Sequence, residues 1–124
     1  MASRLAAAPD ASSWFRGAVV AYASDVKHNL LRVPAGPVVS ETAAATMAAS
    51  VSTLLGADVA LAVTGVGGPE PQDDEPPGTV WLAVHHGHQQ RTELRRIGGD
   101  NDPAAICANA CTDALRLLLE SLDA

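Results

Sequence analysis

The sequence is poor in aromatic residues and in basic residues. Aromatics make up 3% of the 124 residues, although the hydrophobic fraction is 48%. Much of that fraction is alanine, so we expect closely packed layers of Ala, Val and Leu, as in helices lying flat on a sheet. Lys and Arg number 8 against 14 Asp and Glu, a formal net charge of -6. Nucleic acid and anionic membranes bind clustered cations, so neither partner is expected.

Long apolar runs are also missing. None approaches the ~18 to 20 residues that span a bilayer. The first residues, "MASRLAAAPDASS", reach Pro9 and polar side chains before the apolar part of a signal peptide could develop. We therefore expect a cytoplasmic protein, and a chain of 124 residues fits one compact domain.

Metal-binding side chains are few. Cys107 and Cys111 lie four residues apart in a stretch with a helical pattern, where disulfide geometry is rare. We expect both to be buried small apolar side chains, with a metal or redox role as the alternative. The three histidines of "HHGHQQ" alternate between the faces of a strand, and no nearby Cys or carboxylate completes a ligand set. No metal and no cofactor are expected.

The hydrophobic pattern predicts helices and strands in mixed order. Ser40 is the expected N-cap of one helix, which Gly56 ends. The stretch 58–63, "DVALAV", is apolar on both faces, which favours a central, parallel strand. The order predicts an α/β fold with a mixed sheet. The other predicted elements are helices at 2–8, after Ser24 and at 103–122, and strands at 17–23, 79–84 and 91–97, the last two as a hairpin.

A glycine-rich stretch, "LAVTGVGGPEP", follows the predicted strand at 58–63. A dinucleotide-binding turn must open a helix, but four prolines within 69–77 prevent one, and the Gly-Lys-Ser/Thr of a P-loop is missing. Ligands of α/β sheets often bind beyond the ends of parallel strands, where glycines expose backbone N–H groups and Thr64 adds a hydroxyl. The alternative is a loop that only reverses the chain.

Lys27 is placed where a helix disfavours a cation. With Ser24 as N-cap it occupies the third helical position, which costs ~0.3 to 1 kcal/mol and lowers the lysine pKa. A partly neutral lysine can take a proton from a serine hydroxyl and so activate a nucleophile. Tyr22 ends the preceding strand and could reach the same pocket. The alternative is a solvated lysine and a packing tyrosine.

Several motifs together resemble one family. In order they are "SSWFRGAVVAYASDVKHNLL", "VVSE", "LGADVALAVTGVGGPE", "PPGTVWLAV" and "GGD". Over nearly the whole chain they resemble the CinA carboxy-terminal domain, whose members include nicotinamide mononucleotide deamidases. The resemblance implies a three-layer α/β/α sandwich and metal-independent hydrolysis of a carboxamide with release of ammonia. It implies that Lys27 and Tyr22 are catalytic, and that the substrate-binding wall consists of Thr64, Gly65, Gly67, Gly68, Gly78 and Thr79.

The chain departs from this family at two places. The family's first strand and its "Glu-Ser-x-Thr-Gly-Gly" turn, which carries the expected nucleophile, are missing, so we interpret 1–124 as a single domain truncated at its N-terminus. Ser12 and Ser13 align with a different turn. Two arginines that would suit a substrate phosphate are replaced by Asn101 and Cys107.

Two hypotheses follow from these matches and departures. The first is a nicotinamide-nucleotide amidohydrolase whose nucleophile comes from an upstream segment, with a small nucleotide or amide as substrate. The second is a catalytically silent CinA-like domain that binds a small ligand or forms a homodimer.

Overall fold

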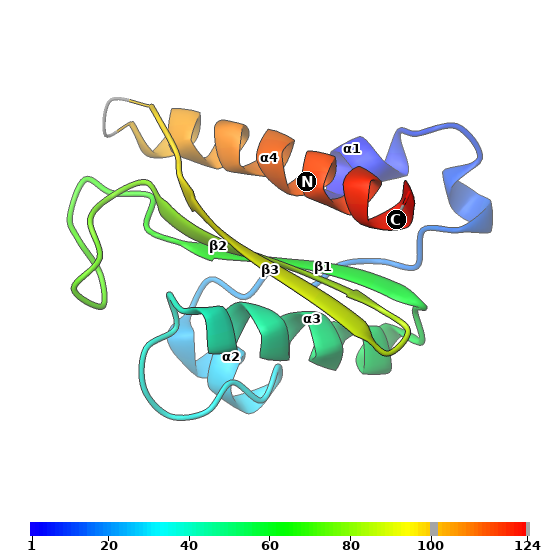
Figure 1. Ribbon diagram of the computed structural model, residues 1–124, viewed down its shortest axis with the longest axis horizontal. Helices are drawn as coiled ribbons and strands as arrows, with labels where there is room; N and C mark the ends of the chain where they lie inside the picture. The colour runs from blue at the N-terminus through cyan, green and yellow to red at the C-terminus, as the bar shows by residue number, and fades with distance from the viewer. Residues whose placement is uncertain (100–101, 124) are drawn as a thin grey trace.

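The computed structural model describes residues 1–99 and 102–123, and it has three layers (Figure 1). A sheet forms the middle layer, with α4 and α1 on one face and α3 and α2 on the other. The three-layer α/β/α architecture expected from the sequence is confirmed. The elements are α1 (Ala2–Ala6), a 3-10 turn (Ala11–Ser13), α2 (Ser24–Asn29), α3 (Glu41–Leu55), β1 (Val59–Gly65), β2 (Thr79–His86), β3 (Gln89–Arg96) and α4 (Pro103–Asp123).

Helix α3 begins and ends where the sequence predicts. The Ser40 hydroxyl accepts a hydrogen bond from the Ala43 N–H at 3.1 Å, and Gly56 adopts a left-handed conformation with φ 63°. Small side chains then let the helix lie close to the sheet. Its buried residues are Ala43, Ala44, Met47 and Ala48.

Strand β2 is the centre of the molecule. It pairs with β1 on one edge and with β3 on the other, and helices cover both of its faces. Ala83 lies in the cluster with α3, whereas Leu82 and Val84 lie in the cluster with α4. The predicted β2–β3 hairpin is confirmed, and its strands extend to His86 and Gln89 around Gly87, which has φ 63°.

Helix α4 buries one stripe at helical spacing, formed by Ile106, Ala110, Ala114 and Leu117. Cys107 and Cys111 each follow a buried residue by one position, which turns them about 100° around the helix. Cys107 is consequently exposed and Cys111 half-buried, and both are free. The expectation that both cysteines are buried was wrong.

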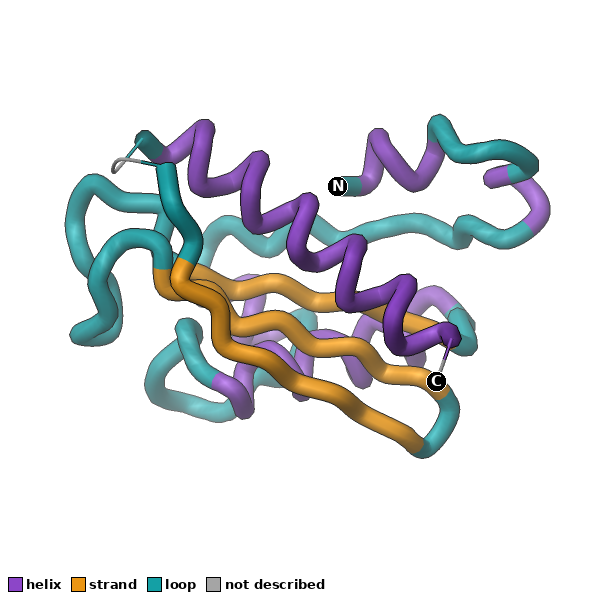
Figure 2. The backbone as a smooth tube through the Cα atoms, turned by 45° about the horizontal axis from the view of Figure 1, so that its top comes forward, coloured by secondary structure: helices purple, strands orange, loops and turns teal. Residues whose placement is uncertain are grey.

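The expected parallel strand pairing is not present. Both pairings in the sheet are antiparallel, and β1 is an edge strand rather than a central one. Residues 17–23 are extended, as predicted, but they form no strand, because they lie across a cavity from β1 instead of beside it. Figure 2 shows this segment running along the sheet beyond β1. The mixed sheet was therefore a wrong expectation for the described residues, whose sheet is antiparallel.

Candidate functional site

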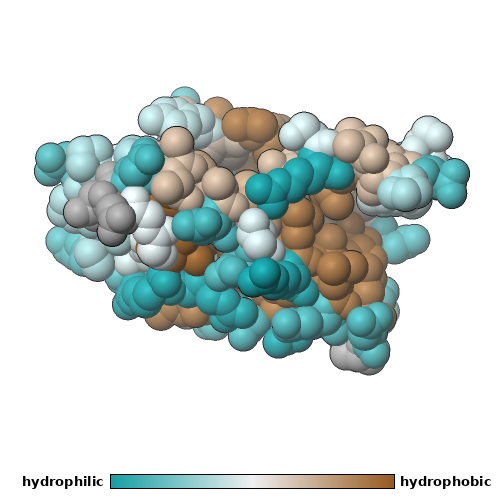
Figure 3. Space-filling model, turned by 90° about the horizontal axis from the view of Figure 1, so that it is seen from above, coloured by the Kyte–Doolittle hydropathy of each residue, from teal (hydrophilic) through white to brown (hydrophobic). Residues whose placement is uncertain are grey.

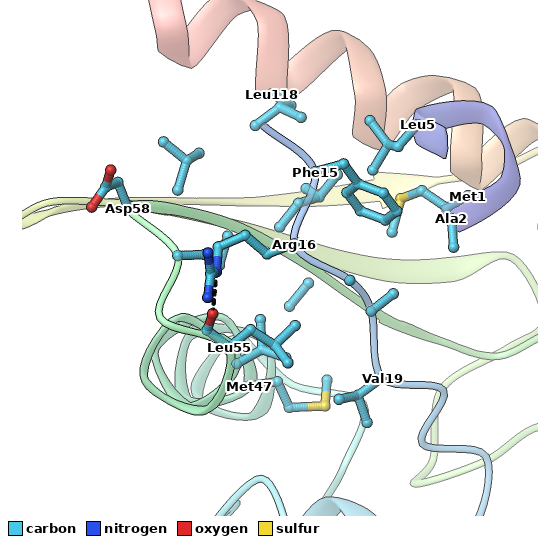
Figure 4. Close-up of a pocket in the computed structure, with 18 of the residues that line it drawn as sticks. Met1, Ala2, Leu5, Phe15, Arg16, Val19, Met47, Leu55, Asp58 and Leu118 are labelled. Carbon is cyan, nitrogen blue, oxygen red and sulfur yellow. Dashed lines mark hydrogen bonds between the residues drawn. The ribbon is translucent and has the colours of Figure 1, made fainter. Parts of the chain in front are cut away.

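A large cavity lies at the open edge of the sheet. It has a volume of about 1020 Å³ and separates residues 15–21 from β1; we call it the edge cavity. At one end, the Arg16 Nε donates a hydrogen bond to the Leu55 carbonyl at 2.5 Å and so holds the segment against the end of α3 (Figure 4). Its walls are mostly apolar. Lys27 is one of the few charged residues that line it.

Lys27 is half-buried on α2, and its pKa is lowered from the ordinary value of 10.5. Burial is the main cause, since it penalises the charged ammonium, and nearby Asp73 opposes it. The predicted lowering of the Lys27 pKa is confirmed, but its main cause is burial and not the helix dipole. The N-cap is Ala23 and not Ser24, so Lys27 is the fourth residue of a helix of six, where the helix dipole contributes little.

Asp73 connects the loop between β1 and β2 to the segment that precedes α3. Its carboxylate accepts hydrogen bonds from the backbone N–H groups of Val38 and Val39 at 2.9 and 3.1 Å. It therefore places a negative charge near Lys27 without forming an ion pair with it among the described residues. Sequence reasoning missed this role. A signal was present, because Asp tolerates the left-handed turn conformation that Asp73 adopts with φ 52°.

Thr64 and Thr79 are buried, with exposed fractions of 2% and 0%. The Thr64 hydroxyl donates to the Val38 carbonyl at 2.5 Å, and the Thr79 hydroxyl accepts from the Arg96 guanidinium at 2.7 Å. Both hydroxyls are thus bound to protein groups. Thr64 shares Val38 with Asp73, so Lys27, Asp73 and Thr64 gather at one end of β1.

The predicted glycines differ in what surrounds them. A Cβ on Gly65 would lie 2.7 Å from the Val80 Cγ2, and one on Gly78 would lie 2.5 Å from the Ile97 carbonyl oxygen. Strand packing therefore requires glycine at these two positions. Gly67 has room for a side chain, its nearest contact being the Pro103 Cβ at 3.9 Å, whereas Gly68 has φ 83°. Within the described part of the chain, no backbone hydrogen bond uses the N–H groups of Gly67 and Gly68, so these groups are available to a ligand.

Tyr22 is not brought to Lys27. Its side chain is 97% exposed, and it is absent from the lining of the edge cavity, which includes Lys27. Cys107 is exposed on α4, and Asn101 lies outside the described residues.

Across residues 1–99 and 102–123 no three His, Cys, Asp or Glu side chains are grouped as metal ligands. No described helix is long and apolar enough to cross a membrane.

The chain is similar to proteins of one family over its whole length. The family model described as the CinA C-terminal domain matches residues 1–122. A CinA-like protein of Frankia casuarinae is 43% identical over 105 residues, 81% of this chain and 24% of that protein. Protein YdeJ of Escherichia coli K12 is 36% identical over 128 residues, 98% of this chain and 73% of YdeJ. The chain thus spans about a quarter of the Frankia protein.

Solved structures agree with this family. The competence damage-inducible protein A of Klebsiella pneumoniae matches with a TM-score of 0.91 and 34% identity, over 98% of this chain and 78% of that chain. A CinA superfamily protein of Escherichia coli matches with a TM-score of 0.88 and 36% identity, over 95% of this chain and 71% of the other. With the family model and these relatives in agreement, this chain belongs to the CinA C-terminal domain family.

Proposed function

We propose that this domain is a nicotinamide-nucleotide amidohydrolase of the nicotinamide mononucleotide deamidase type. The observation that carries the proposal is Lys27, a half-buried lysine whose pKa is lowered by desolvation and which lines the large edge cavity. A lysine whose pKa is lowered by burial accepts a proton more readily than a solvated one at the same pH, because less of it is already protonated, and it needs no metal to do so. Asp73 and Thr64 hold the loops around it in place.

The proposed chemistry is acyl transfer. The neutral Lys27 amine takes the proton of a serine or threonine hydroxyl, and that oxygen attacks the carboxamide carbon. Backbone N–H groups of Gly67 and Gly68 stabilise the oxyanion, and ammonia leaves with a proton returned by Lys27. Water then hydrolyses the ester to a carboxylate. The attacking hydroxyl belongs, in this proposal, to the family's nucleophile turn, upstream of residues 1–124.

One observation favours a second candidate, a catalytically silent domain that binds a small ligand or dimerises. The buried hydroxyls of Thr64 and Thr79 are bound to Val38 and Arg96, and the Tyr22 hydroxyl lies in solvent. Among the described residues, no hydroxyl donates a hydrogen bond to Lys27. The two candidates therefore differ in one measurable property, which is turnover.

Ammonia release from nicotinamide mononucleotide decides between them when it is measured on a protein in which the family's nucleophile turn precedes residues 1–124. For an enzyme, Lys27→Met should lower kcat by about 10² to 10⁴, the usual contribution of a general base. Arg116→Met, which removes an exposed cation from α4, should leave kcat unchanged. No release by the unmodified protein that carries this turn would support the silent domain, and equal rates for Lys27→Met would remove Lys27 from the mechanism.

A second substrate, which lacks the phosphate, tests whether this domain binds the phosphate group of the mononucleotide. The positions where family members carry arginine hold Asn101 and Cys107 here, so the paired hydrogen bonds that guanidinium makes to phosphate are not available from them. If these positions matter, nicotinamide riboside should be hydrolysed with a kcat/KM similar to that of the mononucleotide. A strong preference for the mononucleotide would mean that other groups bind the phosphate.

A further inference from the structure

The loop between β1 and β2 is held by polar contacts and not by packing. None of residues 69–77 is buried. Figure 3 shows hydrophilic side chains at this end of the molecule and a broad apolar surface farther along the face that carries α4. At the tip of the loop, Gln72 and Glu75 exchange two backbone hydrogen bonds at 2.8 and 3.1 Å around Asp73 and Asp74. The tip is therefore a two-residue turn, and what its side chains bind decides where it lies.

One side chain of this turn binds a distant segment. The Asp73 Oδ2 atom accepts from the backbone N–H groups of both Val38 and Val39. Asp74 makes no side-chain hydrogen bond or ion pair within residues 1–99 and 102–123. Both aspartates have a left-handed backbone, with φ 52° and 62°. They form a matched pair, alike in backbone conformation and different in their contacts.

The contact with Val38 brings the Asp73 charge to Lys27. The Val38 carbonyl accepts from the buried Thr64 hydroxyl near the end of β1. The Val33 N–H donates to the Lys27 carbonyl at 3.0 Å, so the segment that Asp73 binds starts at the helix of Lys27. The Asp73 carboxylate therefore acts on the Lys27 amine, and because Asp73 is exposed, water weakens this interaction without removing it.

Other titratable side chains on the segments around Lys27 are Arg16, Tyr22, Asp25, His28, Arg32 and Asp58. Arg16 and Asp58 line the edge cavity, but they lie at its other end, near the start of β1. Tyr22 is almost fully exposed. Within residues 1–99 and 102–123, Asp73 is the one side chain whose charge contributes to the pKa of Lys27.

We propose that Asp73 is a positioning residue for the proposed reaction: its carboxylate holds the loop between β1 and β2 against residues 38–39 and keeps a negative charge beside the Lys27 amine. This inference rests on the proposed function, in which that amine is the proton acceptor. The negative charge stabilises the ammonium that forms when Lys27 takes the hydroxyl proton. Asp73 transfers no proton and does not contact the substrate.

The titration of Lys27 tests the charge without any need for turnover. Lys27 is the only lysine in the sequence, so a chain labelled with ¹³C-lysine gives one lysine side chain to follow by NMR. Asp73→Asn keeps an oxygen that can accept both hydrogen bonds and removes the charge. It should lower the proton affinity of the Lys27 amine about two- to fivefold, as the loss of one partly screened charge does. Asp74→Asn, the matched control, should leave that affinity unchanged.

Amide hydrogen exchange tests the hold on the loop. Asp73→Ala removes both hydrogen bonds, so the Val38 and Val39 amides should exchange about tenfold faster or more. Asp73→Asn and Asp74→Ala should leave both amides within about twofold of the unmodified chain, since neither removes the acceptor. Thermal unfolding checks that each variant folds.

The pH profile of kcat/KM connects the charge with the reaction, in a protein whose nucleophile turn precedes residues 1–124. Only the neutral amine takes a proton, so the rate falls below the pKa of Lys27. Asp73→Asn should move this acid limb to lower pH, by about two- to fivefold in proton concentration. It should also lower the alkaline plateau, because a less basic amine is a weaker acceptor. The two profiles therefore cross, whereas a purely structural defect lowers the rate at every pH.

Several results would overturn this inference. They are an unchanged Lys27 titration in Asp73→Asn, an equal change in Asp74→Asn, unchanged exchange of Val38 and Val39 in Asp73→Ala, or an acid limb that stays in place in an active Asp73→Asn protein. Failure of the proposed function looks different, because the unmodified protein with its nucleophile turn then releases no ammonia. That result would overturn the role in a reaction even if the titration of Lys27 moves.

Discussion

At the residue scale, the burial of Lys27 matters more than its place on a helix. It is the only lysine in the sequence, and the lowering of its pKa comes chiefly from desolvation. The same burial implies a stability cost whenever the ammonium is charged. Lys27 lines a large cavity, and the folded domain keeps it there despite this cost. It is therefore a candidate for a catalytic role.

The pH dependence of stability tests this interpretation. Because the folded-state pKa of Lys27 lies below 10.5, the unfolded chain binds more protons between the two pKa values, and stability rises with pH across that window. Below the window the penalty is fully present. Lys27→Met should therefore increase the free energy of unfolding at pH 7, and the gain should shrink toward pH 10.5.

Urea unfolding of Lys27→Met and of the unmodified chain, at neutral and alkaline pH, measures that difference. Arg116→Met is the control, because it removes a cation that is 71% exposed. A gain from Lys27→Met that stays constant from pH 7 to pH 11 would show that better packing, and not the lost charge, causes it.

Thr64 provides a second test at this scale. Thr64→Val keeps the shape of the side chain but leaves the buried Val38 carbonyl without its hydroxyl donor. We expect a loss of about 1 to 3 kcal/mol in the free energy of unfolding. Thr42→Val, at an exposed position on α3, should change it by no more than about 0.5 kcal/mol. Equal effects of the two substitutions in urea unfolding would contradict the role given to Thr64.

At the element scale, Gly78 joins the glycine-rich region to β2 through close backbone contacts. Its N–H donates to the Val66 carbonyl at 2.8 Å, and its carbonyl accepts from the Ile97 N–H at 2.7 Å. These bonds bring the backbone so near that no Cβ fits. The glycine therefore fixes how the loop after β1 meets the start of β2.

Gly78→Ala should be strongly destabilising. The residue has φ 90°, and the new Cβ would lie 2.5 Å from the Ile97 carbonyl oxygen, so we expect a loss of about 3 kcal/mol or more. Gly87→Ala separates the two causes, since Gly87 has φ 63° and no neighbour within 4 Å. It should cost only about 1 to 2 kcal/mol for the left-handed backbone. Thermal or urea unfolding that ranks Gly87→Ala as the more severe change would refute the steric argument.

At the scale of the whole molecule, the backbone amides of the sheet region should be unevenly protected from hydrogen exchange. β2 is paired on both edges and covered by helices on both faces, whereas residues 17–22 are extended without backbone partners among the described residues. Amide exchange should therefore be slowest in β2, near the rate set by global unfolding, and close to the unprotected rate in residues 17–22. Slow exchange in residues 17–22 of the free chain would mean that the edge cavity is already filled.

The sequence predicted those elements whose signals are local. Ser40 and Gly56 mark the ends of α3 through a side-chain cap and a left-handed backbone, and the β2–β3 hairpin turns at Gly87. The membership of the family was also readable from ordered motifs. Predictions that depended on how a residue packs against the rest of the fold were less accurate. Ser24 is not the cap of α2, and Cys107 is exposed on α4.

The amino-acid sequence by itself determined the α/β class, the ends of α3 and the family, because caps, periodicity and motifs act over a few residues. Only the tertiary structure decided that β1 is an antiparallel edge strand, that burial lowers the pKa of Lys27, and that Asp73 ties its loop to Val38 and Val39. Pairing, desolvation and long-range hydrogen bonds depend on which segments meet in space. For that reason the cavity beside β1, which Lys27 lines, could be located only in three dimensions.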